Sequence, residues 1–259
     1  MDLAAAAAAP VNIALPAEGP RFSSSTPHGS EAYTPDGTDI YEPSDNNTRT
    51  LDENYNVVRV GDEMERVFTE LGLTVVHDRT LYDYPKYNGA YDRSAEAVQR
   101  YLEQYPLHQN RAGRPPGRLV GRTGTAYKAV TRIDGVDTGP GHAGAGLQRG
   151  GEHPNWMQNL SLACRIQESM NTLYPTLARP MTMRSSRYNQ QLSNGSLLVE
   201  VGTAGNAPEE AELAAACLRQ SWQKRWRNEA NRKLPGCAGQ FLRNNKGVHS
   251  NFSHILLII

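Results

Sequence analysis

Two short stretches of the sequence contain residue types that could carry out hydrolytic chemistry. The first is HGSE, in which His28 and Glu31 stand three positions apart. An imidazole and a carboxylate on one turn could reach the same cation, and catalytic zinc usually has three such protein ligands and a water. Taken by itself the spacing is also that of an ordinary polar loop, which is the alternative interpretation.

The second stretch is LLVEVGT, where Glu200 is the one charged residue of an apolar strand. Burial raises the pKa of a carboxylate because it disfavours the charged form, and a neighbouring cation lowers it again. A group under these opposing influences suits the role of general base. The alternative is a structural carboxylate at the end of a strand, paired with an arginine.

A third stretch, RSSRYNQQL, precedes that strand and contains Arg187, Asn189 and Gln190. A guanidinium can bind a carboxylate through two parallel hydrogen bonds, and side-chain amides can bind peptide groups. These residues therefore indicate a binding segment for a substrate that carries such groups. A solvated loop is the alternative.

Apolar periodicity predicts the elements that must position these residues. Helical spacing covers 57–71, where Gly72 can end the helix, and Ser94 can cap the start of a second helix. The remaining predicted elements are helices over 154–174 and from Pro208, and strands over 73–78, 125–130 and 196–203. This alternation predicts one α/β domain, a sandwich with a largely parallel sheet.

Charge and cysteine content exclude several classes of partner and site. Basic and acidic residues both number 27 among 259 residues, so the net charge is zero and gives no indication of nucleic-acid or membrane binding. The run of arginines within Arg111 to Gly121 lacks interleaved aromatic residues, so we expect no nucleic-acid partner. The three cysteines form neither a disulfide framework nor a cysteine zinc site.

Two positions where a parallel sheet should have central strands carry unsuitable residues. Leu107 to Arg122 and Thr138 to Gly151 are rich in Gly, Pro, Arg and His, whereas buried strands are apolar. The hydrophobic content of 38% and the mean hydropathy of -0.61 are correspondingly low, since a packed α/β protein is nearer about 45% apolar. We therefore expect the central strands to be corrupted.

Five ordered blocks carry a family resemblance: HGSEAYTPDGTDIYEPSDNN, TLDENYNVVRVGDEMERV, VVHDRTLYDYPKYNGAYDRSAEAVQRYL, EHPNWMQNLSLA and SSRYNQQLSNGSLLVEVGTAGN. Together they resemble stage II sporulation protein P over about His28 to Glu212, with three interruptions. The resemblance implies a zinc-dependent cell-wall hydrolase with the fold of N-acetylmuramoyl-L-alanine amidases, a three-layer α/β sandwich with a mostly parallel sheet.

The reaction that the resemblance implies is hydrolysis of the amide between the muramic acid lactyl group of peptidoglycan and L-alanine of the stem peptide, with Zn2+ as cofactor. Family members are also credited with cutting peptide cross-links. Sporulation proteins D and M are the implied partners. The implied location is outside the cytoplasmic membrane, tethered by an N-terminal anchor. We expect this chain to lack the anchor, since residues 1–20 have the composition of a linker remnant.

The resemblance also assigns roles to residues of the candidate site. It implies that Glu200 is the catalytic glutamate and that His28 and Glu31 hold the metal. Asp52 and Glu53 are alternative carboxylate ligands, because related amidases take theirs from the start of the following helix.

The same resemblance implies substrate binding by Arg187, Asn189 and Gln190. It places the third metal ligand at the histidine of a D-V-H-R-D strand end, and this sequence has no histidine there. The other histidines lie away from the ligand motifs or in interrupted segments, and we do not expect them to substitute: His77, His108, His142 and His153.

A shift of one base in the reading frame would account for the interruptions. Back-translated from Leu107 and read one base later, the codons permit SIRIVLDVHRDA, and similar shifts permit apolar elements at the other positions. We therefore divide the chain into a linker remnant (1–20), an amidase-like catalytic domain (21–216, interrupted at 21–27, 107–122 and 139–151) and an out-of-frame tail (217–259). The alternatives are an inactive remnant that lacks one zinc ligand, or another zinc hydrolase of carboxypeptidase or deacylase type.

Overall fold

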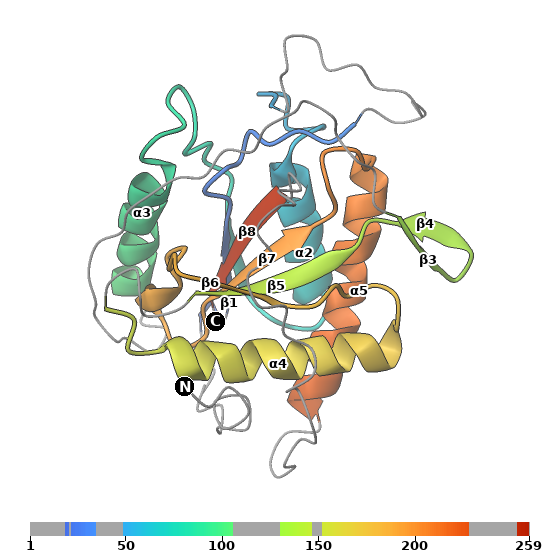
Figure 1. Cartoon of the computed structure of the whole chain (residues 1–259). Helices are drawn as coiled ribbons and strands as arrows, with labels where there is room; N and C mark the ends of the chain where they lie inside the picture. The colour runs from blue at the N-terminus through green and yellow to red at the C-terminus, as the bar shows by residue number, and fades with distance from the viewer. Residues whose placement is uncertain are drawn as a thin grey trace.

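A computed structural model describes residues 19–20, 22–34, 49–105, 130–146, 152–227 and 253–258 (Figure 1). This part of the chain is α/β, with a six-stranded sheet, a separate two-stranded hairpin and helices packed against the sheet. Within it no helix is long and apolar enough to cross a membrane. The predicted strand over 125–130 lies almost wholly outside the described residues.

Four long helices form in the segments where the sequence predicts helices. They are α2 (Val57–Thr69), α3 (Ala90–Gln104), α4 (Trp156–Leu173) and α5 (Pro208–Arg227). Asn56 caps α2 by accepting a hydrogen bond from the backbone N–H of Val58 at 3.0 Å. The chain leaves α2 through Gly72, whose φ of 78° is the left-handed conformation that glycine adopts without strain.

The predicted cap at Ser94 is wrong, because α3 begins one turn earlier. Gly89 precedes Ala90 with φ 83°, a left-handed conformation open to glycine. Ser94 is buried inside the helix, where its hydroxyl donates to the carbonyl of Tyr91 at 3.1 Å. Val98 and Leu102 do point inward, as the periodicity predicts.

The large sheet has the order β2-β1-β8-β7-β5-β6. Its strands are β1 (Phe22–Ser25), β2 (Val75–Asp78), β5 (Gly141–Gly146), β6 (Thr182–Arg184), β7 (Leu197–Val201) and β8 (Ser253–Ile258), and the hairpin is β3 (Thr131–Ile133) with β4 (Val136–Thr138). Only β1–β2 and β5–β6 are parallel. The sheet is therefore mixed rather than mostly parallel, because β8 runs against both β1 and β7, and β7 runs against β5.

The main core lies between one face of this sheet and the helices α2, α4 and α5. Strand β7 contributes Leu197, Val199 and Val201 to it, and the ring of Trp222 on α5 meets that of Phe68 on α2 edge-on at 5.7 Å. Because side chains alternate along a strand, Glu200 lies on the opposite face of the sheet from these helices.

Strands form in two of the three segments that we predicted to interrupt the catalytic domain. Strand β1 lies within 21–27 and β5 lies within 139–151, whereas 107–122 is outside the described residues. Helix α5 continues past residue 216 and buries Leu218 and Trp222 in the core. The reading-frame interpretation of these segments stays a prediction.

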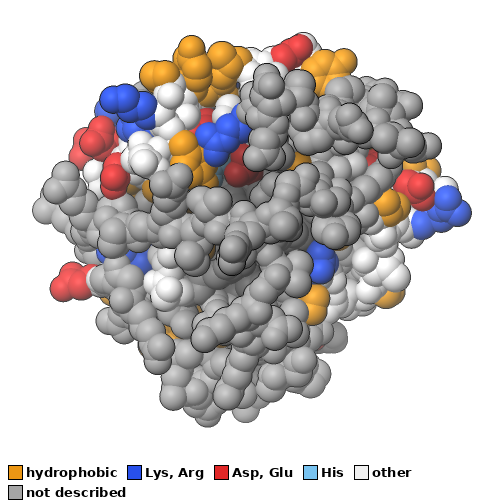
Figure 2. Space-filling model, turned by 45° about the horizontal axis from the view of Figure 1, so that its top comes forward, with side chains coloured by type: hydrophobic (Ala, Val, Ile, Leu, Met, Phe, Trp, Pro, Cys, Tyr) orange, Lys and Arg blue, Asp and Glu red, His pale blue; other side chains and the backbone are white. Residues whose placement is uncertain are grey.

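The described surface is of mixed character. Figure 2 shows Lys and Arg side chains beside Asp and Glu side chains and scattered apolar ones on the described part of this face. This pattern agrees with the net charge of zero.

Candidate functional site

The HGSE motif forms a turn immediately after β1. The backbone N–H of Glu31 donates to the carbonyl of His28 at 3.2 Å, and the carbonyl of Glu31 accepts from the N–H of Val57 at the start of α2 at 3.1 Å. A Cβ at Gly29 would lie 2.8 Å from Cδ2 of Leu81, so glycine permits the turn to approach the loop after β2. The turn is thus held between that loop and α2.

Aromatic rings surround the imidazole of His28, which is 5% exposed. It stacks on the ring of Tyr87, with centroids 4.5 Å apart and planes 13° apart. The ring of Tyr91 meets it edge-on at 5.1 Å. The guanidinium of Arg49 lies 3.9 Å from the centre of the Tyr87 ring, a cation–π contact on that ring.

Tyr91 connects the turn to Glu200. Burial raises the pKa of the Tyr91 phenol well above its usual value, and the charges of Glu31 and Glu200 contribute to the same rise. Both carboxylates therefore act electrostatically on one phenol, whose ring also contacts His28. We call His28, Glu31, Glu200 and Tyr91 the Tyr91 cluster.

Glu200 is buried in β7. The backbone register places it opposite His142 of β5 and His254 of β8. Among the side chains that the structure describes, no three His, Cys, Asp or Glu residues form a group that could hold a metal ion.

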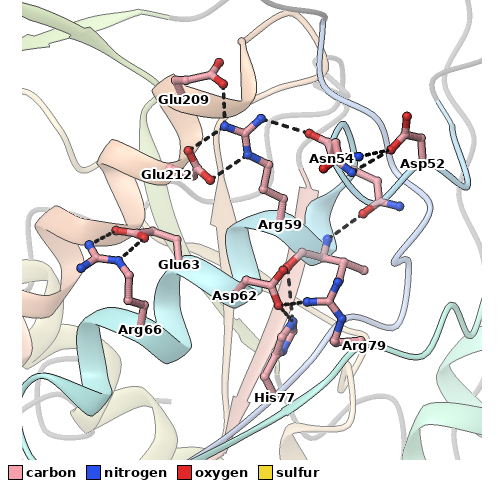
Figure 3. Close-up of polar contacts among 12 residues, drawn as sticks. Asp52, Asn54, Arg59, Asp62, Glu63, Arg66, His77, Arg79, Glu209 and Glu212 are labelled. Atoms are coloured by element: carbon pink, nitrogen blue, oxygen red, sulfur yellow. Dashed lines mark hydrogen bonds and ion pairs between the residues drawn. The ribbon is translucent and has the colours of Figure 1, made fainter.

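The alternative carboxylates, Asp52 and Glu53, lie at the exposed surface in other contacts. Asp52 accepts from the backbone N–H of Asn54 at 3.0 Å, and Glu53 pairs with Arg79, which also pairs with Asp62. Figure 3 shows Asp62 turned toward Arg79 and His77 at the junction of α2 and β2. Of the three candidate carboxylates, Glu31 is the one whose charge raises the pKa of both Tyr87 and Tyr91.

The segment before β7 is buried, so its interpretation as a solvated loop is wrong for Arg187, Asn189 and Gln190. Nη1 of Arg187 donates to the carbonyl of Glu152 at 3.0 Å, and burial lowers the pKa of its guanidinium. Nδ2 of Asn189 donates to the carbonyl of Tyr91 at 2.8 Å.

These contacts join the segment to the Tyr91 cluster. Nδ2 of Asn189 also donates to the hydroxyl of Ser94 at 2.9 Å, and the carbonyl of Gln190 accepts from Asn159 at 2.8 Å. The rings of Tyr188 and Tyr91 lie 5.7 Å apart. Asn189 and Gln190 thus tie the start of α3 and the helix α4 to the strand that carries Glu200.

The other described histidines occupy packing positions. The side chain of His77 in β2 packs against α2, with Nε2 at 3.3 Å from the carbonyl of Val58. His153 is buried at the start of α4, and burial lowers its pKa to about 4. The side chain of His142 and the whole of His108 lie outside what the structure describes.

The segment from Asp83 to Tyr91, which ends in the first turn of α3, contacts the HGSE turn, although no sequence motif indicated its residues. Tyr87 and Tyr91 contact His28, and Asp83 accepts hydrogen bonds from Ser30 in the middle of the HGSE turn. The signal available in the sequence was the density of tyrosines in DYPKYNGAYD.

A family model described as Stage II sporulation protein P (SpoIIP) matches residues 24–220. The chain belongs to this family. The match begins inside β1 and ends inside α5, so it contains the HGSE turn and Glu200. No curated protein and no solved structure matches the chain. Membership in the stage II sporulation protein P family gives a sporulation-related role at the cell wall, and the family is associated with peptidoglycan hydrolysis in general.

Proposed function

We propose that this stage II sporulation protein P hydrolyses the amide that joins the muramic acid lactyl group to L-alanine of the stem peptide. The observation that carries the proposal is the Tyr91 cluster, in which an imidazole and a carboxylate on one turn share a neighbourhood with the buried Glu200. We propose an extracytoplasmic location, with peptidoglycan as substrate and sporulation proteins D and M as partners.

The side chains of His28 and Glu31 are of types that bind zinc. They are two of the three ligands that the family resemblance implies. His28 and Glu31 would supply a nitrogen and a carboxylate oxygen, which are normal zinc ligands. The third ligand expected from the family resemblance falls in 107–122, where the sequence has a histidine only at His108. Because metal affinity depends on the number and geometry of the ligands, we expect this chain to bind zinc weakly.

Zinc, when bound, would polarise the scissile carbonyl and lower the pKa of a water. Glu200 would accept the proton of that water and pass it to the leaving amine, the role of a general base and then a general acid. Glu200 is buried in β7, so its carboxylate would meet the substrate away from bulk water.

In this proposal, Arg187 is the main residue that positions the substrate. A guanidinium suits a stem-peptide carboxylate, since it can make two parallel hydrogen bonds to it. The hydrogen bonds of Asn189 and the backbone of Gln190 to neighbouring elements support a framework role for these two residues, which would keep Arg187 beside the strand of Glu200.

The test is digestion of purified peptidoglycan by the full chain, with and without added zinc. Amidase activity creates new amino-terminal L-alanine, which amine labelling detects. Glu200→Gln should lower this release about 10²- to 10⁴-fold, the usual contribution of a general acid–base group. Glu103→Gln, at an exposed position of α3, is the control and should leave it unchanged. Full activity of Glu200→Gln would remove Glu200 from the mechanism.

An inactive remnant is the second candidate, favoured because the sequence has no histidine at the position of the D-V-H-R-D strand end. If the wild-type chain takes up no zinc and releases no L-alanine amino termini, the remnant is correct. A carboxypeptidase- or deacylase-type hydrolase would instead release a terminal amino acid or an acyl group, which product analysis separates from the amidase outcome.

A further inference from the structure

We infer that Asp83 is a positioning residue for the HGSE turn, holding His28 in a fixed orientation. Its carboxylate is fully buried. Oδ1 accepts from the backbone N–H of Ser30 at 3.1 Å, and Oδ2 accepts from the Ser30 hydroxyl at 2.6 Å. Ser30 lies between His28 and Glu31, so both hydrogen bonds fix the turn at its centre.

Because the Asp83 carboxylate is buried, its partners matter for its stability. A carboxylate removed from water is costly unless hydrogen bonds or opposite charges compensate it. The partners that compensate Asp83 are Ser30 and the guanidinium of Arg49, whose Nη1 lies 3.9 Å from Oδ2. The buried charge is therefore coupled to the conformation of the HGSE turn.

A second connection reaches His28 through aromatic rings. Arg49, the cationic partner of Asp83, lies over the ring of Tyr87, and Tyr87 stacks on the imidazole of His28. Asp83 thus acts on His28 from two sides, through the backbone of the turn and through the Arg49–Tyr87 stack. We call these four residues, Asp83, Ser30, Arg49 and Tyr87, the turn clamp.

The consequence for metal binding rests on the proposed function. Groups that orient a metal-ligating histidine from outside typically change metal affinity about 10- to 100-fold when they are mutated. The turn clamp would lower the entropic cost of binding because the imidazole is already oriented before a cation arrives. The clamp itself can be tested without metal.

The first experiment measures the ring protons of His28 by NMR in the full metal-free chain. Stacking on Tyr87 should shift these signals upfield, and comparison with His28→Gln identifies them among the seven histidines. Asp83→Asn keeps the shape of the side chain and removes the charge and one acceptor, so we expect the upfield shift to be lost. Ser30→Ala should reduce it, and Ser30→Thr, which keeps the hydroxyl, should restore it.

Asp78→Asn is the matched control. Asp78 is also buried and also accepts from a backbone N–H, that of Thr80 at 3.0 Å, and from a hydroxyl, that of Tyr82. Its hydrogen bonds stay within its own loop, so this variant should keep the His28 shift. If Asp83→Asn and Ser30→Ala leave the His28 signals as Asp78→Asn does, Asp83 does not position the turn.

The second experiment measures zinc affinity of the same variants by competition with a chromophoric chelator. If the wild type binds zinc, Asp83→Asn should weaken binding about 10- to 100-fold relative to Asp78→Asn. Absence of zinc binding by the wild type would refute the zinc mechanism, while the NMR result would still decide whether the turn clamp exists.

Discussion

Three consecutive hydroxyl groups in and after β1 are buried without hydrogen-bond partners among the described residues: Ser24, Ser25 and Thr26. A buried polar group left without a partner costs about 1–3 kcal/mol. Ser24→Ala should therefore raise the free energy of unfolding by about 1 kcal/mol, measured by urea denaturation.

The control for this prediction is Ser94→Ala. Ser94 is also a buried serine, but its hydroxyl donates to the carbonyl of Tyr91 and accepts from Asn189. Its removal should lower the stability, since a made hydrogen bond contributes about 1 kcal/mol and Asn189 would lose a partner. Equal destabilisation of both variants would mean that the Ser24 hydroxyl has a stabilising partner.

At the residue scale, sequence reasoning identified residues whose type alone indicates chemistry. His28, Glu31 and Glu200 stand in motifs. In the structure the ring of His28 contacts Tyr91 and the charges of both carboxylates raise the pKa of Tyr91, while their catalytic roles stay a prediction. Asp83 was missed because its role depends on Ser30, which lies 53 positions away in the chain. A pattern of neighbouring residues in the sequence cannot indicate a contact between residues so far apart in the chain.

A close approach between α2 and β2 depends on Gly61. A Cβ at this position would lie 2.2 Å from Cε1 of His77, far inside van der Waals contact. Replacing glycine by alanine inside a helix ordinarily stabilises a protein by roughly 0.5–1 kcal/mol. We expect the opposite sign here: Gly61→Ala should lower the midpoint of thermal unfolding, because the added methyl group displaces the His77 ring.

The double variant Gly61→Ala/His77→Ala checks the cause. Removal of the imidazole makes room for the methyl group, so alanine at position 61 should be tolerated in that background. A double-mutant cycle gives the coupling between the two positions. If Gly61→Ala costs the same with and without His77, the steric explanation is wrong.

At the element scale, periodicity predicted the helices better than the strands. Helices α2, α3 and α4 follow an apolar spacing that can be read within one short segment of the sequence. Strands β1 and β5 consist largely of Ser and Gly, which have low strand propensity, and their pairing comes from neighbouring strands. Sequence composition therefore could not reveal them.

At the scale of the whole molecule, the apolar run near the C-terminus completes the sheet. Strand β8 lies between β1 and β7 and pairs with both (Figure 1). The five-residue apolar run from Ile255 to Ile259 indicates strand propensity, but its pairing partners lie far away in the chain. The mixed character of the sheet follows from this long-range pairing, which the local alternation of strands and helices cannot predict.

Deletion of residues 253–259 should therefore affect the entire fold. It would expose unpaired backbone groups on β1 and β7 in the middle of the sheet and separate the β2–β1 pair from β7-β5-β6. Each lost hydrogen bond is worth about 1 kcal/mol, and a total stability of about 5–15 kcal/mol cannot absorb many such losses. We expect a lower melting temperature by circular dichroism and aggregation by gel filtration, since exposed strand edges pair between molecules. A chain shortened by Ile259 alone keeps β8 and should behave as the wild type does. An unchanged melting temperature after the full deletion would mean that the rest of the sheet is stable without β8.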